Sequence, residues 1–236
     1  MIPVMKPHLP TVECVSPYLE QMDRSGIYSN FGPLVSQLES RYATFLGVNP
    51  NQVVSVANAT LGIQGACTVF PPREWIVPAF TFAATLHALL HSNFTPRLCD
   101  VSMSTYELDL EGCPISQDTG IVPVMPFGKK PDPGIYETER FTVIDAAASL
   151  GASEGSLHGL GANQAAVFSL HATKVLGAGE GGIVVFGDVE YASVFRKWTN
   201  FAFNESRIST FPATNAKMSE MHAAYALASL DGWESE

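Results

Sequence analysis

The chain has few basic residues and little charge of any kind. Of its 236 residues only 13 are lysine or arginine, against 23 aspartate or glutamate, so the net charge is -10 and charged residues make up 15%. Nonspecific binding to nucleic acid depends on clustered lysine and arginine that neutralise phosphates. The charge balance therefore argues against a nucleic-acid partner, and the pair Lys129-Lys130 is too short to change that conclusion.

Cysteines and long apolar runs are also scarce. The four cysteines, Cys14, Cys67, Cys99 and Cys113, show no CxxC spacing and no matching histidine cluster, so we expect neither a metal site nor a disulfide framework. The N-terminus lacks the charged start and apolar run of a signal peptide. Polar residues interrupt the apolar run 53–70 before it could cross a bilayer. We expect a cytoplasmic protein without a membrane span.

Short apolar runs alternate with segments of helical spacing, and 46% of the residues are hydrophobic, enough for a sizeable core. Strands are predicted at Val53–Val56, Trp75–Pro78, Thr95–Cys99, Ile121–Val124, Phe141–Ile144, Ala165–Ser169 and Ile183–Phe186. Helices are predicted at Pro17–Arg24, Leu34–Leu46, from Thr60, at Thr81–His91, near Val189–Thr199 and at Ala216–Leu230. This alternation predicts an α/β fold with a mostly parallel, doubly wound sheet.

Candidate functional residues follow the predicted strands. In such sheets, ligands bind outside the carboxyl ends of the strands. The segments 58–60, 80–82 and 169–174 lie just after a strand, and Asp145 ends one. Their common placement predicts one site at this edge of the sheet.

Lys174 is the most informative of these residues. It lies in the run FSLHATKVLGAGEGG, between hydroxyl side chains and a glycine-rich tail. An amine in such a setting suits a Schiff base to an aldehyde cofactor that carries phosphate. The same run would also suit a solvated loop lysine beside flexible glycines.

Five further residues fit a phosphorylated ring cofactor. Ala59 and Thr60 open a helix whose N-terminus would favour an anion, although an ordinary N-cap looks the same. Asp145 could pair with a protonated ring nitrogen, or cap the following helix. Phe82 could cover a planar ring or pack in the core, and Ser169 could bond phosphate or its own backbone.

Seven segments in order along the chain resemble the DegT/StrS family of pyridoxal-phosphate-dependent sugar aminotransferases. They are YSNFGPLVSQLESRYATFLGV, SVANATLG, IVPAFTFAAT, DVSMSTYELD, VIDAAASLGA, FSLHATKVLGAGEGG and NAKMSEMHAAYALASL. The resemblance implies the aspartate-aminotransferase fold (fold type I), a three-layer α/β structure with a mostly parallel sheet of seven-stranded type. It divides the chain into an N-terminal segment, 1–30, and a large cofactor-binding domain, 31–236, without the C-terminal small domain.

The resemblance also implies roles for individual residues. Lys174 would be the Schiff-base lysine and Asp145 the partner of the pyridine nitrogen, with Phe82 stacked on the ring. Ala59, Thr60 and Ser169 would surround the phosphate. Asn200 matches an asparagine that reaches the phosphate from the neighbouring subunit, which implies a homodimer with shared active sites.

The implied reaction moves an amino group from glutamate to a keto group of a nucleotide-linked 6-deoxy sugar. Two positions depart from the family pattern: Ala148 stands where many members have histidine or glutamine, and Ala202 ends an NFG-like turn. An alternative is a catalytically weak, cofactor-binding scaffold or dimer partner. Lys174 argues against the related sugar 3-dehydratases, which have histidine there. A dehydrogenase phosphate loop is disfavoured because Gly181-Gly182 precede a strand, not a helix.

Overall fold

A computed structural model describes residues 6–132, 139–204 and 206–234, and its centre is one seven-stranded sheet. The strands are β1 (Val53–Val56), β2 (Glu74–Pro78), β3 (Arg97–Cys99), β4 (Thr119–Ile121), β5 (Thr142–Asp145), β6 (Gln164–Ser169) and β7 (Gly182–Phe186). Their order is β1-β7-β6-β5-β4-β2-β3. β7 is antiparallel to both of its neighbours, and the other pairs are parallel.

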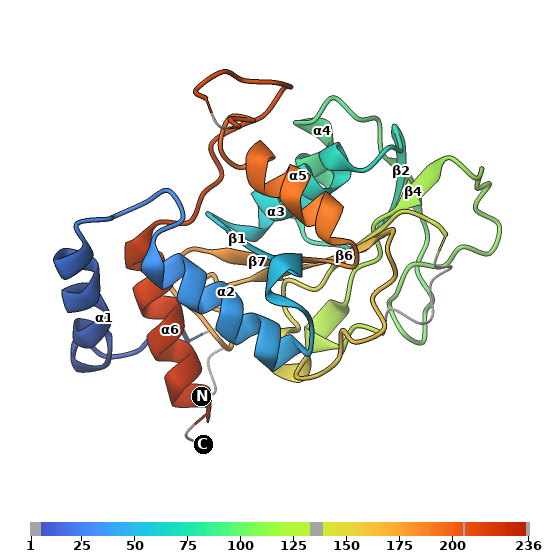
Figure 1. The fold of residues 1–236 in the computed structure, drawn as a ribbon. Coiled ribbons are helices and arrows are strands. Elements are labelled where there is room, and N and C mark those ends of the chain that lie inside the picture. Colours follow the sequence, from blue (N-terminus) through green and yellow to red (C-terminus); the bar gives the residue numbers. More distant parts are fainter. Residues whose placement is uncertain (1–5, 133–138, 205, 235–236) are drawn as a thin grey trace.

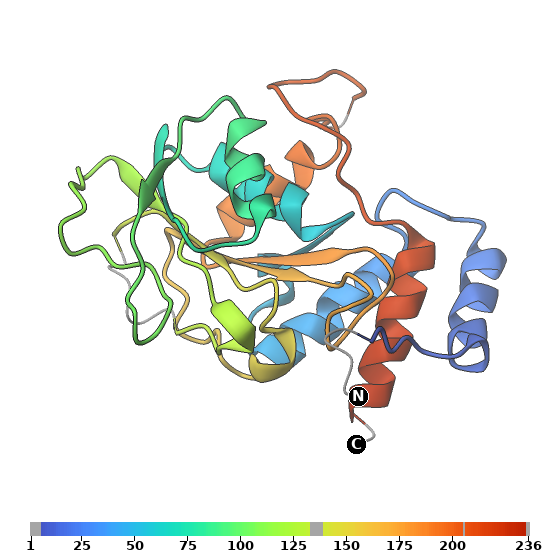
Figure 2. The ribbon, with the colours of Figure 1, turned by 180° about the vertical axis from the view of Figure 1, so that it is seen from behind.

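Helices cover both faces of the sheet, which gives the predicted three layers. The helices are α1 (Val12–Ser25), α2 (Pro33–Leu46), α3 (Ala59–Val69), α4 (Ala83–Leu90), α5 (Val189–Trp198) and α6 (Glu220–Glu234). α3, α4 and α5 lie on one face, while α2 and α6 lie on the other, with α1 beside α6 (Figures 1 and 2). None of the helices in the described part of the chain is long and apolar enough to cross a membrane.

Alternate residues of the central strands face opposite layers. Val53 and Val185 belong to the core beneath α2 and α6, whereas Val54, Val56 and Val184 belong to the core beneath α3 and α5. Because both faces are buried, these strands are mostly apolar and show no regular polar alternation; the one polar residue of β1, Ser55, is itself buried. This is why short apolar runs were sufficient to predict the sheet.

Several element boundaries differ from the prediction. α1 begins at Val12, five residues before Pro17, and β4 ends at Ile121, where the predicted strand began. α6 begins at Glu220 because Ala216 and Lys217 are held in an extended segment. The Ala216 carbonyl accepts a 2.8 Å hydrogen bond from the N–H of Ala57, and Lys217 bridges to β1. The predicted stop of α2 is confirmed at Gly47, which has φ of 73°.

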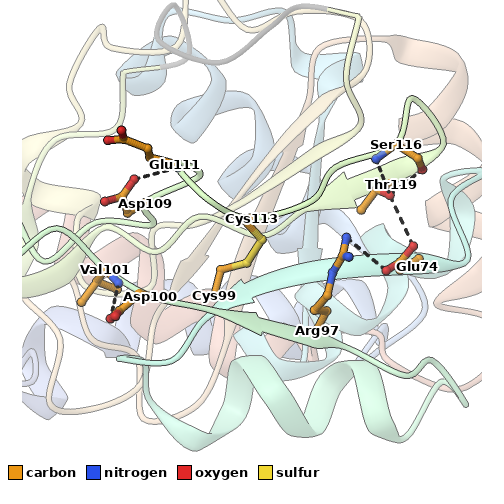
Figure 3. The surroundings of a disulfide bond; sticks show 10 residues. All are labelled: Glu74, Arg97, Cys99, Asp100, Val101, Asp109, Glu111, Cys113, Ser116 and Thr119. Atoms are coloured by element: carbon orange, nitrogen blue, oxygen red, sulfur yellow. Dashed lines mark hydrogen bonds and ion pairs between the residues drawn. A yellow bond between two sulfur atoms is a disulfide. The ribbon is translucent and has the colours of Figure 1, made fainter.

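A disulfide joins Cys99, at the end of β3, to Cys113, contrary to the expectation from cysteine spacing. Figure 3 shows it beside the ion pair between Arg97 and Glu74, whose N–O distance is 3.2 Å. The two cysteines are 14 residues apart, with Cα atoms separated by 6.3 Å. The spacing of the cysteines in the sequence did not indicate this bond, because a disulfide that closes one loop has no characteristic spacing such as CxxC.

Candidate active site

A cavity of about 360 Å³ opens at the carboxyl ends of the parallel strands. It is lined by Ala59, Thr60, Ile63, Phe80, Thr81, Phe82, Ala84, Val124, Met125, Pro126, Phe127, Asp145, Ala147, Ala148 and Lys174. Five of the seven residues predicted for the site therefore meet here: Ala59, Thr60, Phe82, Asp145 and Lys174. They come from four separate chain segments that the parallel topology brings to one edge.

Asp145 lies at the end of β5 and is buried. Its Oδ2 accepts a 2.7 Å hydrogen bond from the hydroxyl of Thr85, and its Oδ1 accepts one of 3.1 Å from the N–H of Ala147. Burial raises the pKa of Asp145 above its ordinary value, while these two bonds and the charge of Lys174 lower it. A carboxyl group in this state would gain from a further cationic partner inside the cavity.

Lys174 lies in the tight loop that connects β6 to β7. The Lys174 N–H donates a 2.8 Å bond to the His171 carbonyl, and the Ala172 N–H donates one of 2.9 Å to the Gly179 carbonyl. A Cβ atom on Gly177 would lie 3.1 Å from the carbonyl oxygens of both Ala172 and His171. A side chain at this position would push these carbonyl groups away by a few tenths of an ångström, so glycine favours the close fold of the loop that holds Lys174 at the cavity.

The first turn of α3 forms another wall. The Asn58 side chain caps this helix by accepting a 3.0 Å bond from the N–H of Leu61. The earlier N–H groups, including that of Thr60, have no partner within the helix and favour an anion. A Cβ atom on Gly182 would lie 2.9 Å from the nitrogen of Ala59, so the last glycine of the GEGG run lets β7 approach this helix terminus.

Phe82 and Ser169 differ in their relation to the cavity. Phe82 lines it and is 81% exposed, which is inconsistent with the alternative reading of core packing. Ser169 is buried at the end of β6, and its Oγ accepts a 3.2 Å bond from the N–H of His171. It is not among the cavity-lining residues, so its contact with a phosphate stays a prediction.

Asn200 belongs to a second cavity, of about 690 Å³. Its Oδ1 accepts a 2.6 Å bond from Nζ of Lys217, which also donates one of 2.7 Å to Oδ1 of Asn215. Burial lowers the pKa of Lys217. Phe201 and Ala202 have left-handed backbone conformations, with φ of 58° and 53°. Since glycine adopts this conformation most readily, the geometry explains why a glycine would suit position 202.

The residues of the first cavity fit pyridoxal phosphate. Asp145 is a buried carboxyl group with two fixed donors and room for a cation, which suits a protonated ring nitrogen. The N-terminus of α3 suits the phosphate group, and Lys174 supplies the amine. Ala148, one of the two departures from the family pattern, also lines the cavity, where its small side chain leaves space.

Sequence analysis missed Thr85 and the cavity wall at 124–127. Thr85 is fully buried, and its hydroxyl lies 2.7 Å from that of Thr81, four residues earlier and just before the start of α4. The available signal was the i, i+4 spacing of two threonines at the start of an otherwise apolar helix predicted over 81–91. The 124–127 wall carried no signal, since its residues are apolar and follow a short strand.

Comparison with known proteins agrees with this geometry. Residues 12–236 match the DegT/DnrJ/EryC1/StrS aminotransferase family. The chain is 29% identical to dTDP-4-amino-4,6-dideoxy-D-glucose transaminase of Shigella dysenteriae, over 97% of this chain and 64% of that protein. A structure from Bacillus cereus assigned as a PLP-dependent aminotransferase has a TM-score of 0.87 and 29% identity, over 99% of this chain and 67% of that one.

A third similarity is to the structure of DesI in the presence of its TDP-sugar product. The TM-score is 0.84 and the identity 34%, over 97% of this chain and 60% of that one. The chain spans less than two thirds of the Shigella relative's length. The cofactor that these comparisons support is pyridoxal phosphate. Because the family match covers nearly the whole sequence, the chain belongs to the DegT/DnrJ/EryC1/StrS aminotransferase family.

Proposed function

We propose that this protein is a pyridoxal-phosphate-dependent aminotransferase that moves an amino group from glutamate to a keto group of a nucleotide-linked 6-deoxy sugar. One observation carries the proposal: Lys174, from the loop after β6, and Asp145, at the end of β5, line one cavity with the N-terminus of α3. The names of the transaminase and TDP-sugar relatives support the acceptor class. The cytoplasmic location remains a prediction, as does the boundary at residue 30 between the N-terminal segment and the large cofactor-binding domain.

Bound pyridoxal phosphate supplies an aldehyde that takes up amino groups and a ring that accepts an electron pair. Asp145 would hold the ring nitrogen protonated, and Phe82 would cover one ring face. Thr60 and the first N–H groups of α3 would bind the phosphate. Lys174 would be the covalent anchor, and its Nζ would move the proton at the reacting carbon of the substrate.

Absorption spectroscopy tests the cofactor and its lysine together. The protein with added pyridoxal phosphate should show a visible band of lysine-bound cofactor that bleaches on addition of glutamate. Lys174→Ala should lose both the band and turnover, and Lys174→Arg should also lose turnover. Lys130→Ala, which removes an exposed lysine, is the control for nonspecific attachment. An equal band in Lys174→Ala would overturn the assignment of this lysine.

We further propose a homodimer in which Asn200 serves the neighbouring subunit. Among the described residues, Asn200 and Lys174 line different cavities. Mixing Asn200→Ala with Lys174→Ala subunits tests this, because a mixed dimer would have one site with neither change. Partial recovery of activity on mixing is expected. Two inactive variants that stay inactive in verified mixed dimers would contradict the shared site.

The family comparison does not favour the alternative of a catalytically weak scaffold, since the matching family is one of aminotransferases and the Shigella relative is named as a transaminase. A turnover assay with a nucleotide-linked keto sugar separates the two functions. Bleaching by glutamate followed by recovery of the band with the keto sugar would support the enzyme. A stable band that glutamate does not bleach would support the scaffold.

A further inference from the structure

Three aromatic rings form a cluster at the mouth of the Lys174 cavity. They belong to Phe80, Tyr106 and Phe127, which we call the aromatic rim. The ring centroids of Phe80 lie 5.6 Å from Tyr106 and 6.2 Å from Phe127, and those of Tyr106 and Phe127 are 5.9 Å apart. Phe80 and Phe127 also line the cavity itself. The rim is therefore continuous with the candidate active site.

The aromatic rim is open to solvent. Phe127 is 81% exposed, Phe80 47% and Tyr106 43%. Single exposed aromatic rings are common on protein surfaces and need no explanation. A contiguous group of exposed rings beside a cavity is instead typical of a binding face. The rings contact one another at their edges or at a tilt, which leaves ring surface available for stacking.

The backbone holds two of the three rings in unfavourable conformations. Tyr106 has φ of 59° and Phe127 has φ of 56°, both in the left-handed region that bulky residues rarely adopt. Such conformations persist only where the surroundings enforce them, and they gather at functional sites. This strain gives a reason, independent of exposure, to assign the rim a role.

Several interactions fix the loop that carries Tyr106. The loop is a tight hairpin, in which Val101 bridges to Leu108 and the Tyr106 N–H donates a 2.8 Å bond to the Ser102 carbonyl. The disulfide shown in Figure 3 closes this loop at its base. An ion pair between Glu107 and Lys129 ties it to the turn that contains Phe127. These interactions hold the loop of Tyr106 and the turn of Phe127 in place without a bound ligand.

We propose that the aromatic rim stacks against the nucleobase of the acceptor substrate. This inference rests on the proposed function. In a nucleotide-linked sugar, the keto carbon must reach Lys174 inside the cavity, so the nucleotide end remains toward the mouth. A nucleobase presents a flat π face, and aromatic side chains stack on such faces with little dependence on which base it is. The rim would thereby recognise the nucleotide while the cavity recognises the sugar.

Isothermal titration of the cofactor-loaded protein with dTDP tests the rim, with inorganic pyrophosphate as a probe that lacks a base. Tyr106→Ala and Phe127→Ala should each weaken dTDP binding about tenfold, the size of one lost base–aromatic stack. Phe127→Tyr, which keeps a ring, should stay within about twofold of wild type. Met103→Ala, an exposed apolar change in the same loop, is the matched control. Pyrophosphate affinity should not change in any variant.

The visible band of the cofactor, recorded on the same samples, separates this inference from the proposed function. A normal band that bleaches with glutamate, together with equal dTDP affinity in wild type and both alanine variants, would overturn the aromatic rim alone. Undetectable dTDP binding by the wild type would overturn it as well. Loss of pyrophosphate binding in parallel with dTDP would indicate a collapsed loop and would also count against stacking.

Discussion

The hydroxyl of Thr85 donates a 2.7 Å hydrogen bond to Oδ2 of Asp145, and both side chains are buried. Thr85 lies on α4 and Asp145 ends β5, so the bond connects a helix to the strand that carries the acid. The N–H of Ala147 holds the other carboxylate oxygen at 3.1 Å. With both oxygens fixed, the carboxylate has one defined orientation toward the cavity.

Thr85→Val should weaken cofactor binding about tenfold or more, because a hydrogen bond to a charged group contributes about 1.5–3 kcal/mol. Spectrophotometric titration with pyridoxal phosphate measures the change. Thr68→Val is the control, since its hydroxyl donates to the Gln64 carbonyl within α3, away from the acid. Equal affinity in wild type and Thr85→Val would show that the hydroxyl does not position Asp145.

Asp145→Asn should make the cofactor-free protein more stable at pH 7. Burial raises the pKa of Asp145 in the folded state. The stability that the protonated carboxyl group contributes is therefore fully present below the ordinary pKa of 3.8, and it is lost as the pH rises through the raised pKa of the folded state. At pH 7 the ionised carboxylate therefore costs stability, which an uncharged amide would not.

Thermal unfolding of cofactor-free wild type and Asp145→Asn from pH 7 down to about pH 4 measures this effect, and the difference should shrink as the pH falls. The same variant should bind pyridoxal phosphate at least about tenfold more weakly, because it loses a charged partner. A difference in stability that is independent of pH would contradict the assigned cause.

Glu220→Ala should lower the free energy of unfolding by about 2–4 kcal/mol. The Glu220 carboxylate is fully buried and accepts bonds of 2.7 Å and 3.0 Å from the N–H groups of Leu34 and Val35, at the start of α2. Its removal leaves both donors buried without an acceptor. Urea denaturation provides the measurement, and exposed Glu190→Ala, in the first turn of α5, should cost less than about 1 kcal/mol.

Cys99→Ser should destabilise the protein, because the disulfide to Cys113 closes a loop of about 15 residues and such a loop contributes about 3 kcal/mol in the chain-entropy account. Reduction of the wild type with dithiothreitol should have a similar effect on urea denaturation. Cys14→Ser removes an exposed free cysteine and should change little. Identical curves for oxidised and reduced wild type would show that the bond contributes no stability.

The helices and strands were predictable where the local pattern was strong. β1, β6 and β7 are mostly β-branched or apolar, and a glycine stops α2. The start of α6 was predicted four residues early because Ala216 suits a helix. Its carbonyl instead accepts a hydrogen bond from Ala57, and only tertiary contact with the end of β1 supplies that donor.

Sequence alone determined the family and singled out Lys174 and Asp145 as the residues proposed to do the chemistry, because a lysine beside GEGG and an aspartate ending a strand are local patterns. Tertiary structure decided which of them meet. It brought Lys174, Asp145 and Phe82 to one cavity and placed Asn200 in another. It also paired Cys99 with Cys113 and gathered Phe80, Tyr106 and Phe127. These relationships depend on strand order and loop paths, which no local pattern encodes.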